Sequence, residues 1–208
     1  MFVIGIDFDN TIVDYDKLFY CVAYERGLVK EDAFINKKAI RDNIRNLPEG
    51  ETKWRRLQTI VYGPRIGEAK LMNGVVGFLK QCHEKAAPVY IISHKTEFAG
   101  SDISGINLRI AALTWMKKNN LFNHRELGLT EKNVYFEETR EGKINRVKYL
   151  NCTHFIDDLE ETFIEKTFPV NVEKILLTRE KTHCAQNNVK AFTEWKQIGR
   201  YLFNGRHC

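Results

Sequence analysis

An apolar run close to the N-terminus, ending in two acids, constrains the fold more than any other feature. Residues 2–6 read Phe-Val-Ile-Gly-Ile, which has the length and β-branched content of a buried strand. Asp7 and Asp9 follow at its carboxyl end, and residues two apart in an extended chain project to the same side. Two like charges in one place are unfavourable unless a cation or a shared proton offsets them. The pair therefore indicates either a turn cap or a binding site at a strand end.

Further apolar runs recur along the chain, with helical patterns between them. Strands are predicted at 89–92, 133–136, 154–156 and 174–177, and the intervening segments carry apolar residues at helical spacing. Five short strands with little alternation, separated by helices, are typical of a parallel sheet covered on both faces. The predicted fold class is therefore α/β, with a doubly wound, Rossmann-like parallel sheet.

The segment between residues 14 and 70 follows a different pattern and contains no predicted strand. Apolar residues at helical spacing predict three helices, at about 15–27, 36–46 and 52–63. We therefore expect a sheet domain formed by residues 1–13 and 71–208, with residues 14–70 inserted as a small helical domain. Between Lys37 and Arg56 the insertion carries seven basic residues against three acids, which is typical of a solvated helix face. One or two of these cations could instead face an anionic substrate.

Composition narrows the class of protein. A chain of 208 residues with 43% hydrophobic and 28% charged residues can bury one well-filled core. The net charge of +5 includes no long basic tract, so nucleic-acid binding is not indicated. The five cysteines are odd in number and form no Cys-x-x-Cys pair, which favours free thiols in a reducing compartment. With no membrane span and no signal-peptide pattern, a cytoplasmic protein without a membrane partner is expected.

Polar residues stand at the ends of several predicted strands, and these residues define a candidate site. In a doubly wound sheet the carboxyl ends of the strands share one edge, so residues far apart in sequence meet in one crevice. Clustered carboxylates provide the oxygen ligands that a hard cation such as Mg²⁺ requires. A lysine and a serine beside them suit a phosphoryl group. The residues concerned are Asp7, Asp9, Ser93, Asp157 and Asp158 at strand ends, with Lys143 at the start of a helix.

Four of these segments, in this order, resemble the motifs of the haloacid dehalogenase (HAD) superfamily of phosphohydrolases. They are Asp7-Phe8-Asp9-Asn10-Thr11, Ser93 after an apolar strand, Lys143 ahead of a helix, and Asp157-Asp158 after another apolar strand. The resemblance extends from residue 2 to about residue 160. The insertion at 14–70 resembles the helical cap that many members carry between the first two motifs.

The resemblance implies a role for each residue. Asp7 would be the nucleophile that forms an aspartyl-phosphate, and Asp9 would exchange protons with the leaving group and with water. Mg²⁺ would be held by Asp7, the main-chain carbonyl of Asp9 and Asp158, with Asp157 close by. Ser93 and Lys143 would bind the phosphoryl oxygens. The presence of Asp9 favours phosphoryl chemistry, because the true dehalogenases of the superfamily lack this second acid and need no metal.

Two assignments and the reaction itself have alternatives. Lys148 is a rival to Lys143, although it would lie about 7.5 Å further along the helix at 1.5 Å per residue. The acid pair Asp157-Asp158 leaves open which carboxylate contacts the metal.

The expected function is a Mg²⁺-dependent phosphatase acting on a small phosphorylated metabolite, and a phosphotransferase or phosphomutase is the alternative on the same scaffold. A receiver-like signalling module and a nucleic-acid-binding domain are the non-enzymatic alternatives. The substrate and the oligomeric state stay open.

Overall fold

The chain divides into two compact units. The computed structural model describes residues 2–31, 33, 36–99, 105–179 and 188–204. The first unit, called the core unit below, consists of Met1–Ile12, Leu71–Lys95 and Asn119–Cys208. The second, called the helical unit, consists of Val13–Lys70 and Thr96–Lys118. Each unit is described by itself.

A six-stranded parallel sheet forms the centre of the core unit. Its spatial order is β5-β4-β1-β6-β7-β8, and every neighbouring pair is parallel. In register, Ile4–Ile6 pair with Val89–Ile91 on one side and with His154–Ile156 on the other, so β1 occupies a central position. The strands are β1 (Ile4–Ile6), β4 (Val89–His94), β5 (Val134–Glu137), β6 (His154–Asp157), β7 (Glu173–Leu177) and β8 (Val189–Phe192).

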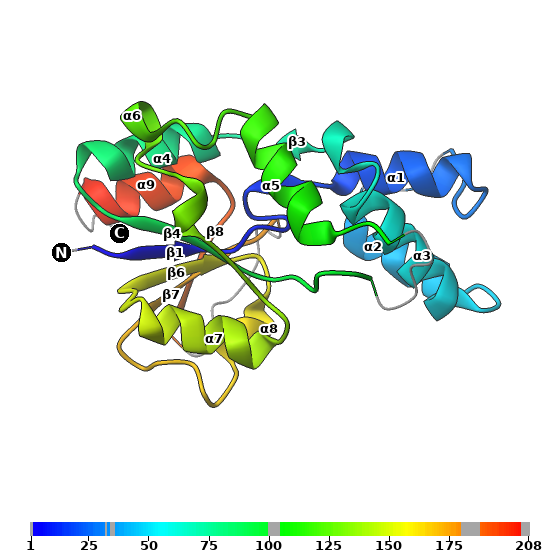
Figure 1. Ribbon diagram of the computed structural model, residues 1–208. Helices are drawn as coiled ribbons and strands as arrows, with labels where there is room; N and C mark the ends of the chain where they lie inside the picture. Colours follow the sequence, from blue (N-terminus) through cyan, green and yellow to red (C-terminus); the bar gives the residue numbers. More distant parts are fainter. Residues whose placement is uncertain (1, 32, 34–35, 100–104, 180–187, 205–208) are drawn as a thin grey trace. The chain divides into compact units, whose positions relative to one another are not determined.

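Helices cover both faces of this sheet, which confirms the predicted doubly wound α/β architecture. Figure 1 shows α4, α6 and α9 on one face and α7 and α8 on the other. This arrangement follows from the chain order, because a parallel neighbour can be reached only through a crossover that packs against one face. The elements are α4 (Val75–Glu84), α6 (His124–Leu127), η2 (Glu131–Asn133), α7 (Arg140–Tyr149), α8 (Glu160–Phe163) and α9 (Trp195–Phe203).

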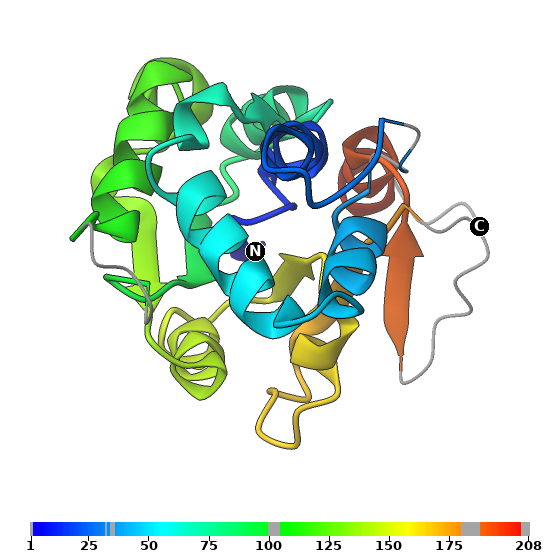
Figure 2. The ribbon, with the colours of Figure 1, turned by 90° about the vertical axis from the view of Figure 1, so that its right-hand side faces the viewer.

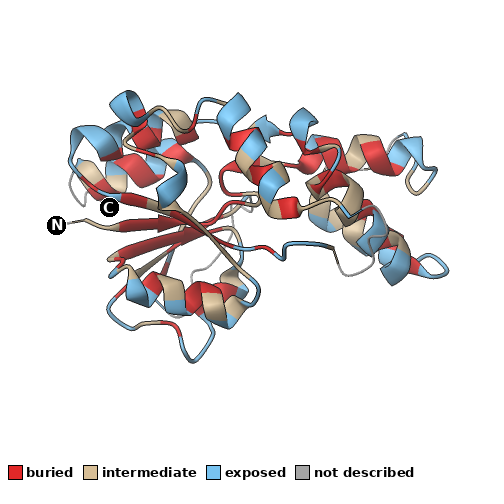
Figure 3. Cartoon of the chain, in the orientation of Figure 1, coloured by how far each residue is buried: buried red, intermediate tan, exposed pale blue. Residues whose placement is uncertain are grey.

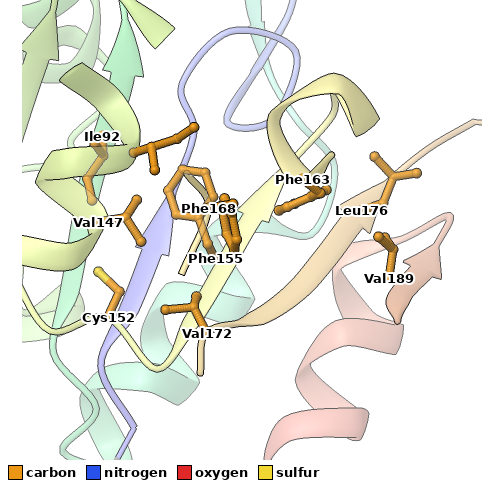
Figure 4. Close-up of a cluster of buried hydrophobic side chains, with 10 residues drawn as sticks. Ile92, Val147, Cys152, Phe155, Phe163, Phe168, Val172, Leu176 and Val189 are labelled. Atoms are coloured by element: carbon orange, nitrogen blue, oxygen red, sulfur yellow. The ribbon is translucent and has the colours of Figure 1, made fainter. Parts of the chain in front are cut away.

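The central strands β1 and β6 are buried along their whole length, and β4 and β7 over most of theirs (Figure 3). On the face covered by α7 and α8, aliphatic and aromatic side chains form one continuous cluster (Figure 4). Within it, the rings of Phe163 and Phe168 meet edge to face at 5.4 Å, which is a favourable arrangement for aromatic pairs. The cluster consists of Ile92, Ile144, Val147, Cys152, Phe155, Phe163, Phe168, Val172, Leu176 and Val189. It gives the site-bearing strands a rigid base.

The sheet contains one strand more than the sequence pattern predicts. The predicted strand at 174–177 is present as β7, but it is not the last, because β8 (Val189–Phe192) pairs beside it. β8 lies at the edge of the sheet, and of its four residues only Val189 is buried. A half-exposed edge strand of four residues lacks the continuous apolar run that identifies an inner strand.

The helical unit contains the three helices that the sequence predicts between residues 14 and 70. The third begins at Gly50, two residues before the expected start, and the residue before it, Glu49, has a left-handed conformation with φ of 53°. Stacked rings of Phe19 and Trp54, with centroids 5.0 Å apart, join α1 to α3, and α2 lies beside α3 (Figure 2). The elements are α1 (Asp16–Glu25), α2 (Lys37–Arg45), α3 (Gly50–Tyr62), η1 (Ile66–Glu68) and α5 (Leu108–Lys118), with short strands β2 (Val13–Asp14) and β3 (Lys70–Leu71).

The observed division differs from the expected one at Val13, which belongs to the helical unit, and in one longer segment. Residues 96–118, which include α5, belong to the helical unit, whereas the sequence pattern placed everything after residue 71 in the sheet domain. The indole N–H of Trp115 donates a hydrogen bond of 3.0 Å to the carbonyl of Ala69, and α5 packs against α3 and η1. Every helix within the described residues is too short or too polar to span a lipid bilayer.

Candidate active site

The register of the sheet places Asp7 beside Asp157. Ile6 is paired with Ile156, so the next residues on β1 and β6 are Asp7 and Asp157. The N–H of Asp7 donates to the carbonyl of Ile156 at 2.8 Å, which fixes this level of the sheet. Both carboxylates are buried, with 5% and 0% exposure. The sequence predicts both acids at the carboxyl ends of strands, and the structure shows that these two strands are adjacent.

Helix α7 brings Lys143 between these two acids. The hydroxyl of Thr139 caps the helix by accepting a hydrogen bond of 2.9 Å from the N–H of Gly142, so Lys143 falls in the first turn. Its ammonium lies 2.7 Å from Oδ1 of Asp7 and 2.7 Å from Oδ2 of Asp157. Lys148, the rival candidate, is exposed one turn further along the same helix. The geometry therefore brings Lys143 into the acid cluster.

Three carboxylates at this edge offer ligand atoms for one metal ion. Oxygens of Asp7, Asp157 and Asp158 all lie within 4.8 Å of one another. An all-oxygen donor set of this charge fits a hard divalent cation such as Mg²⁺. The amide of Asn10 donates to Oδ2 of Asp158 at 3.4 Å, and the N–H of Leu159 donates to Oδ1 of Asp157 at 3.0 Å. Asp158 and Asp157 are therefore held in place by neighbours from the turn after β1 and from the loop after β6.

Burial and charge act in opposite directions on the central pair. Burial raises the pKa of Asp7 to about 6, and the charges of Asp157 and Asp9 add to this effect while Lys143 opposes it. Burial alone would lower the pKa of Lys143, but the carboxylates of Asp157 and Asp7 outweigh it and raise that pKa. Lys143 is thus a permanently charged group inside the protein, stabilised by two acids.

Ser93 lies at the carboxyl end of β4, on the strand beside β1. It is only 1% exposed, and its hydroxyl has no hydrogen-bond partner among the residues that the structure describes. Buried hydroxyl groups are normally paired, so a lone one at the end of a strand is notable. This hydroxyl is available to bind a ligand atom that enters the site.

Asp9 contacts a residue that the sequence analysis missed. The ammonium of Lys95 lies 2.9 Å from Oδ2 and 3.1 Å from Oδ1 of Asp9. The available signal was its position two residues after Ser93, because this spacing keeps the same side of an extended chain. Asn10 was also missed as a partner of Asp158, and its φ of 57° makes the sharp turn after Asp9. Asparagine tolerates this left-handed conformation better than most residues do.

Comparison with solved structures places this fold among known hydrolases. A HAD hydrolase of family IA, variant 3, from Entamoeba histolytica has a TM-score of 0.57 at 14% identity, over 95% of each chain. A haloacid dehalogenase-like family hydrolase from Xanthomonas campestris has a TM-score of 0.55 at 9% identity, over 97% of this chain and 94% of that chain. A HAD family hydrolase from Deinococcus radiodurans, solved with bound phosphate and sodium, has a TM-score of 0.50 at 13% identity, over 97% of this chain and 95% of that chain.

These similarities establish the fold, which is that of the HAD hydrolases. No protein-family model matches the sequence, and no curated protein matches it either. The similarity is therefore carried by the order of the elements and the shape of the sheet, at identities between 9% and 14% in the three structures above.

Proposed function

We propose that this protein is a Mg²⁺-dependent phosphatase of the HAD superfamily that hydrolyses a small phosphorylated metabolite through an aspartyl-phosphate. The observation that carries the proposal is the buried cluster in which Lys143 bridges Asp7 and Asp157, with Asp158 close enough to share a cation. Acids that are required only for turn capping would have no reason to be buried around an ammonium ion.

Asp7 is the nucleophile in this proposal. One of its oxygens attacks phosphorus and forms the new O–P bond, while the bond from phosphorus to the leaving oxygen breaks and its electron pair departs with that oxygen. A proton from the carboxyl group of Asp9 then completes the alcohol product. In the second step a water oxygen attacks phosphorus, the bond to Asp7 breaks to release phosphate, and Asp9 receives the water proton.

Ser93 and Lys143 bind the phosphoryl oxygens. The buried hydroxyl of Ser93 lacks a partner in the described chain, so an incoming phosphoryl oxygen would satisfy it. An ammonium has three donor positions, and Asp7 and Asp157 account for two of those of Lys143. The third can reach a phosphoryl oxygen as charge redistributes over the transferred group.

The metal would be held by Asp7, the main-chain carbonyl of Asp9 and Asp158. Both oxygens of Asp157 already accept hydrogen bonds, from Lys143 and from the N–H of Leu159, so we assign Asp157 chiefly to holding Lys143. Bound Mg²⁺ would offset the repulsion between these carboxylates and the phosphate dianion. We place the enzyme in the cytoplasm, because the described cysteines Cys21, Cys82 and Cys152 are free thiols.

The test is a phosphate-release screen with Mg²⁺ over sugar phosphates, nucleotides and polyol phosphates, with no acceptor other than water. We expect phosphate release from at least one class of substrate and loss of release in excess chelator. Asp7→Asn should abolish turnover and the trapping of phosphoenzyme, whereas the exposed Asp42→Asn should change neither. Activity that survives in Asp7→Asn would show that Asp7 is not the nucleophile. Transfer that requires an added acceptor would instead favour the phosphotransferase.

A further inference from the structure

A second lysine lies in the site outside the four motif positions. Lys95 is 4% exposed, and its ammonium contacts both carboxylate oxygens of Asp9, at 2.9 Å and 3.1 Å. The side chain of Asp9 is 20% exposed and that of Lys95 only 3%, so the acid is accessible to solvent while the lysine is buried. The two acids of the first motif therefore contact different lysines, Asp7 contacting Lys143 and Asp9 contacting Lys95.

The side chain of Lys95 is fixed at both ends. Its backbone N–H donates to the carbonyl of Glu137 at 2.9 Å, which extends the pairing of β4 with β5 one residue beyond His94. Its ammonium lies 5.6 Å from the ring centre of Phe8, a cation–π distance. Phe8 is itself fully buried and packs edge to face against Phe136 on β5. The position of the ammonium is thus set by the sheet.

Asp9 needs such support because of where it lies. It follows the last residue of β1 by three positions, and the left-handed Asn10 comes directly after it. A carboxylate in a turn rotates readily about its terminal torsion, which is broad and roughly two-fold. Contact of one ammonium with both oxygens selects one plane for the carboxyl group.

We propose that Lys95 is a positioning residue, which holds the carboxyl group of Asp9 in the plane needed to pass a proton to the leaving oxygen. This role rests on the phosphatase function proposed above. In this role Lys95 acts through Asp9 and does not itself bind substrate. Misplacement of a reacting group by about 1 Å is enough to cost roughly 100-fold in rate, so the loss of Lys95 should be large.

Substrates whose leaving groups differ in basicity can distinguish this role from a merely structural one, because only a basic leaving group needs a proton from Asp9. We compare kcat/KM for an aryl ester, p-nitrophenyl phosphate, whose leaving group departs without a proton, with kcat/KM for the best alkyl phosphate of the screen. Lys95→Met should lower the alkyl value by about 100-fold or more, which is the usual size of a general-acid contribution. It should lower the aryl value by less than about tenfold, with little change in KM. Lys95→Arg should restore much of the alkyl activity.

Controls and a double variant complete the test. Lys148→Met makes the same change on an exposed lysine and should leave both values unchanged. In an Asp9→Asn background, Lys95→Met should cause no further loss, because the two residues act as one unit. Methionine has nearly the size of lysine, and Lys95→Gln serves the same comparison if the methionine variant fails to fold.

Several outcomes would overturn the role of Lys95. Equal losses for the aryl and alkyl esters, or no loss at all, would show that Lys95 does not serve proton transfer. A rise in KM with kcat unchanged would identify Lys95 as a substrate ligand. A further loss in the Asp9→Asn background would separate the two residues. A wild-type protein that releases phosphate from no ester in the presence of Mg²⁺ would instead overturn the proposed function, and this role with it.

Discussion

The candidate site and the helical unit contain ion pairs of similar length in opposite surroundings. In the site, Lys143 lies 2.7 Å from Asp7 and Asp157, and the three side chains are at most 7% exposed. In the helical unit, Glu51 lies 2.8 Å from Arg45 and 3.2 Å from Arg55, with side chains that are 44–67% exposed. The distances between the charged atoms do not distinguish the ion pairs of the site from those of the helical unit. Burial separates them.

Burial affects the pKa values of the acids in these two sets of ion pairs. Hydrogen bonds from Arg45 and Arg55 lower the pKa of Glu51, as for any carboxylate that gains cationic partners in water. Burial raises the pKa of Asp7 to about 6 although its cationic partner is close. A buried charge therefore depends on its partner, whereas an exposed charge loses little when its partner is removed. Removing a partner should therefore cost far more stability in the site than in the helical unit.

Removal of Lys143 should have the largest effect on stability. Lys143→Met leaves Asp7 and Asp157 buried together without a cation, and breaking a buried pair in this way costs about 3–5 kcal/mol. We expect this loss in the free energy of unfolding from urea denaturation at pH 7.5 without metal. Lys148→Met, at an exposed position on the same helix, should stay within about 0.5 kcal/mol of the wild type. A loss below about 1 kcal/mol in Lys143→Met would mean that water already stabilises this cluster.

Asp7→Asn should have a smaller effect of the opposite sign. The folded-state pKa of about 6 lies above the ordinary value of 3.8, so the folded protein holds this proton more tightly than the unfolded chain does. Stability should then fall as the pH rises from about 4 to 6, and the full cost of the charge is present above pH 6. At pH 7.5 in chelator, Asp7→Asn should gain about 1–3 kcal/mol, since one pKa unit corresponds to about 1.4 kcal/mol.

The pH dependence provides the check on this prediction. The gain from Asp7→Asn should shrink as the pH falls below 6 and vanish once the pH is well below the ordinary pKa of 3.8, where Asp7 is neutral in both states. Asp42→Asn, at an exposed position in α2, should show no comparable gain. An Asp7→Asn variant that is less stable than the wild type at pH 7.5 would show that the negative charge of Asp7 stabilises the fold. The same substitution is expected to abolish activity, so the acid would be retained for chemistry at the expense of stability.

The convergence of the site could be predicted from sequence because a parallel sheet imposes it. Once β1, β4 and β6 are recognised as parallel strands, their carboxyl ends must lie at one edge, which brings Asp7, Ser93 and Asp157 together. Lys143 could be predicted for a similar reason, since α7 leads into β6. Its exact partners could not, because they depend on side-chain directions and not on the order of elements.

The burial of Lys95 and the position of residues 96–118 depend on contacts between residues far apart in sequence, which the local sequence pattern does not reveal. Lys95 reads as a loop residue in the sequence, and it is buried because pairing with β5 continues past the end of β4. The segment 96–118 has the same amphipathic pattern as the helices that cover the sheet, yet the bond from Trp115 to Ala69 joins it to the helical unit. In each case the decisive partner lies more than forty residues away along the chain.

Charge composition alone does not show which cations of the helical unit have acidic partners. The basic excess between Lys37 and Arg56 suggested cations that could face an anionic substrate, but Arg41, Arg45 and Arg55 pair with acids in their own helices or close by. Because these pairs are exposed, they compete with water and with salt for each charge. They satisfy local charges and leave fewer of the seven cations for a substrate.

The smallest expected effect belongs to the acid that serves two of these arginines. Glu51→Gln removes the partner of both Arg45 and Arg55, yet all three side chains are at least 44% exposed and stay hydrated afterwards. We expect a fall in the melting temperature that is barely measurable at low ionic strength and disappears in about 1 M salt, where the Debye length is about 3 Å. The loss in Lys143→Met should persist in the same salt, because buried pairs are screened far less. A salt-resistant loss in Glu51→Gln as large as that of Lys143→Met would mean that burial does not distinguish the two clusters.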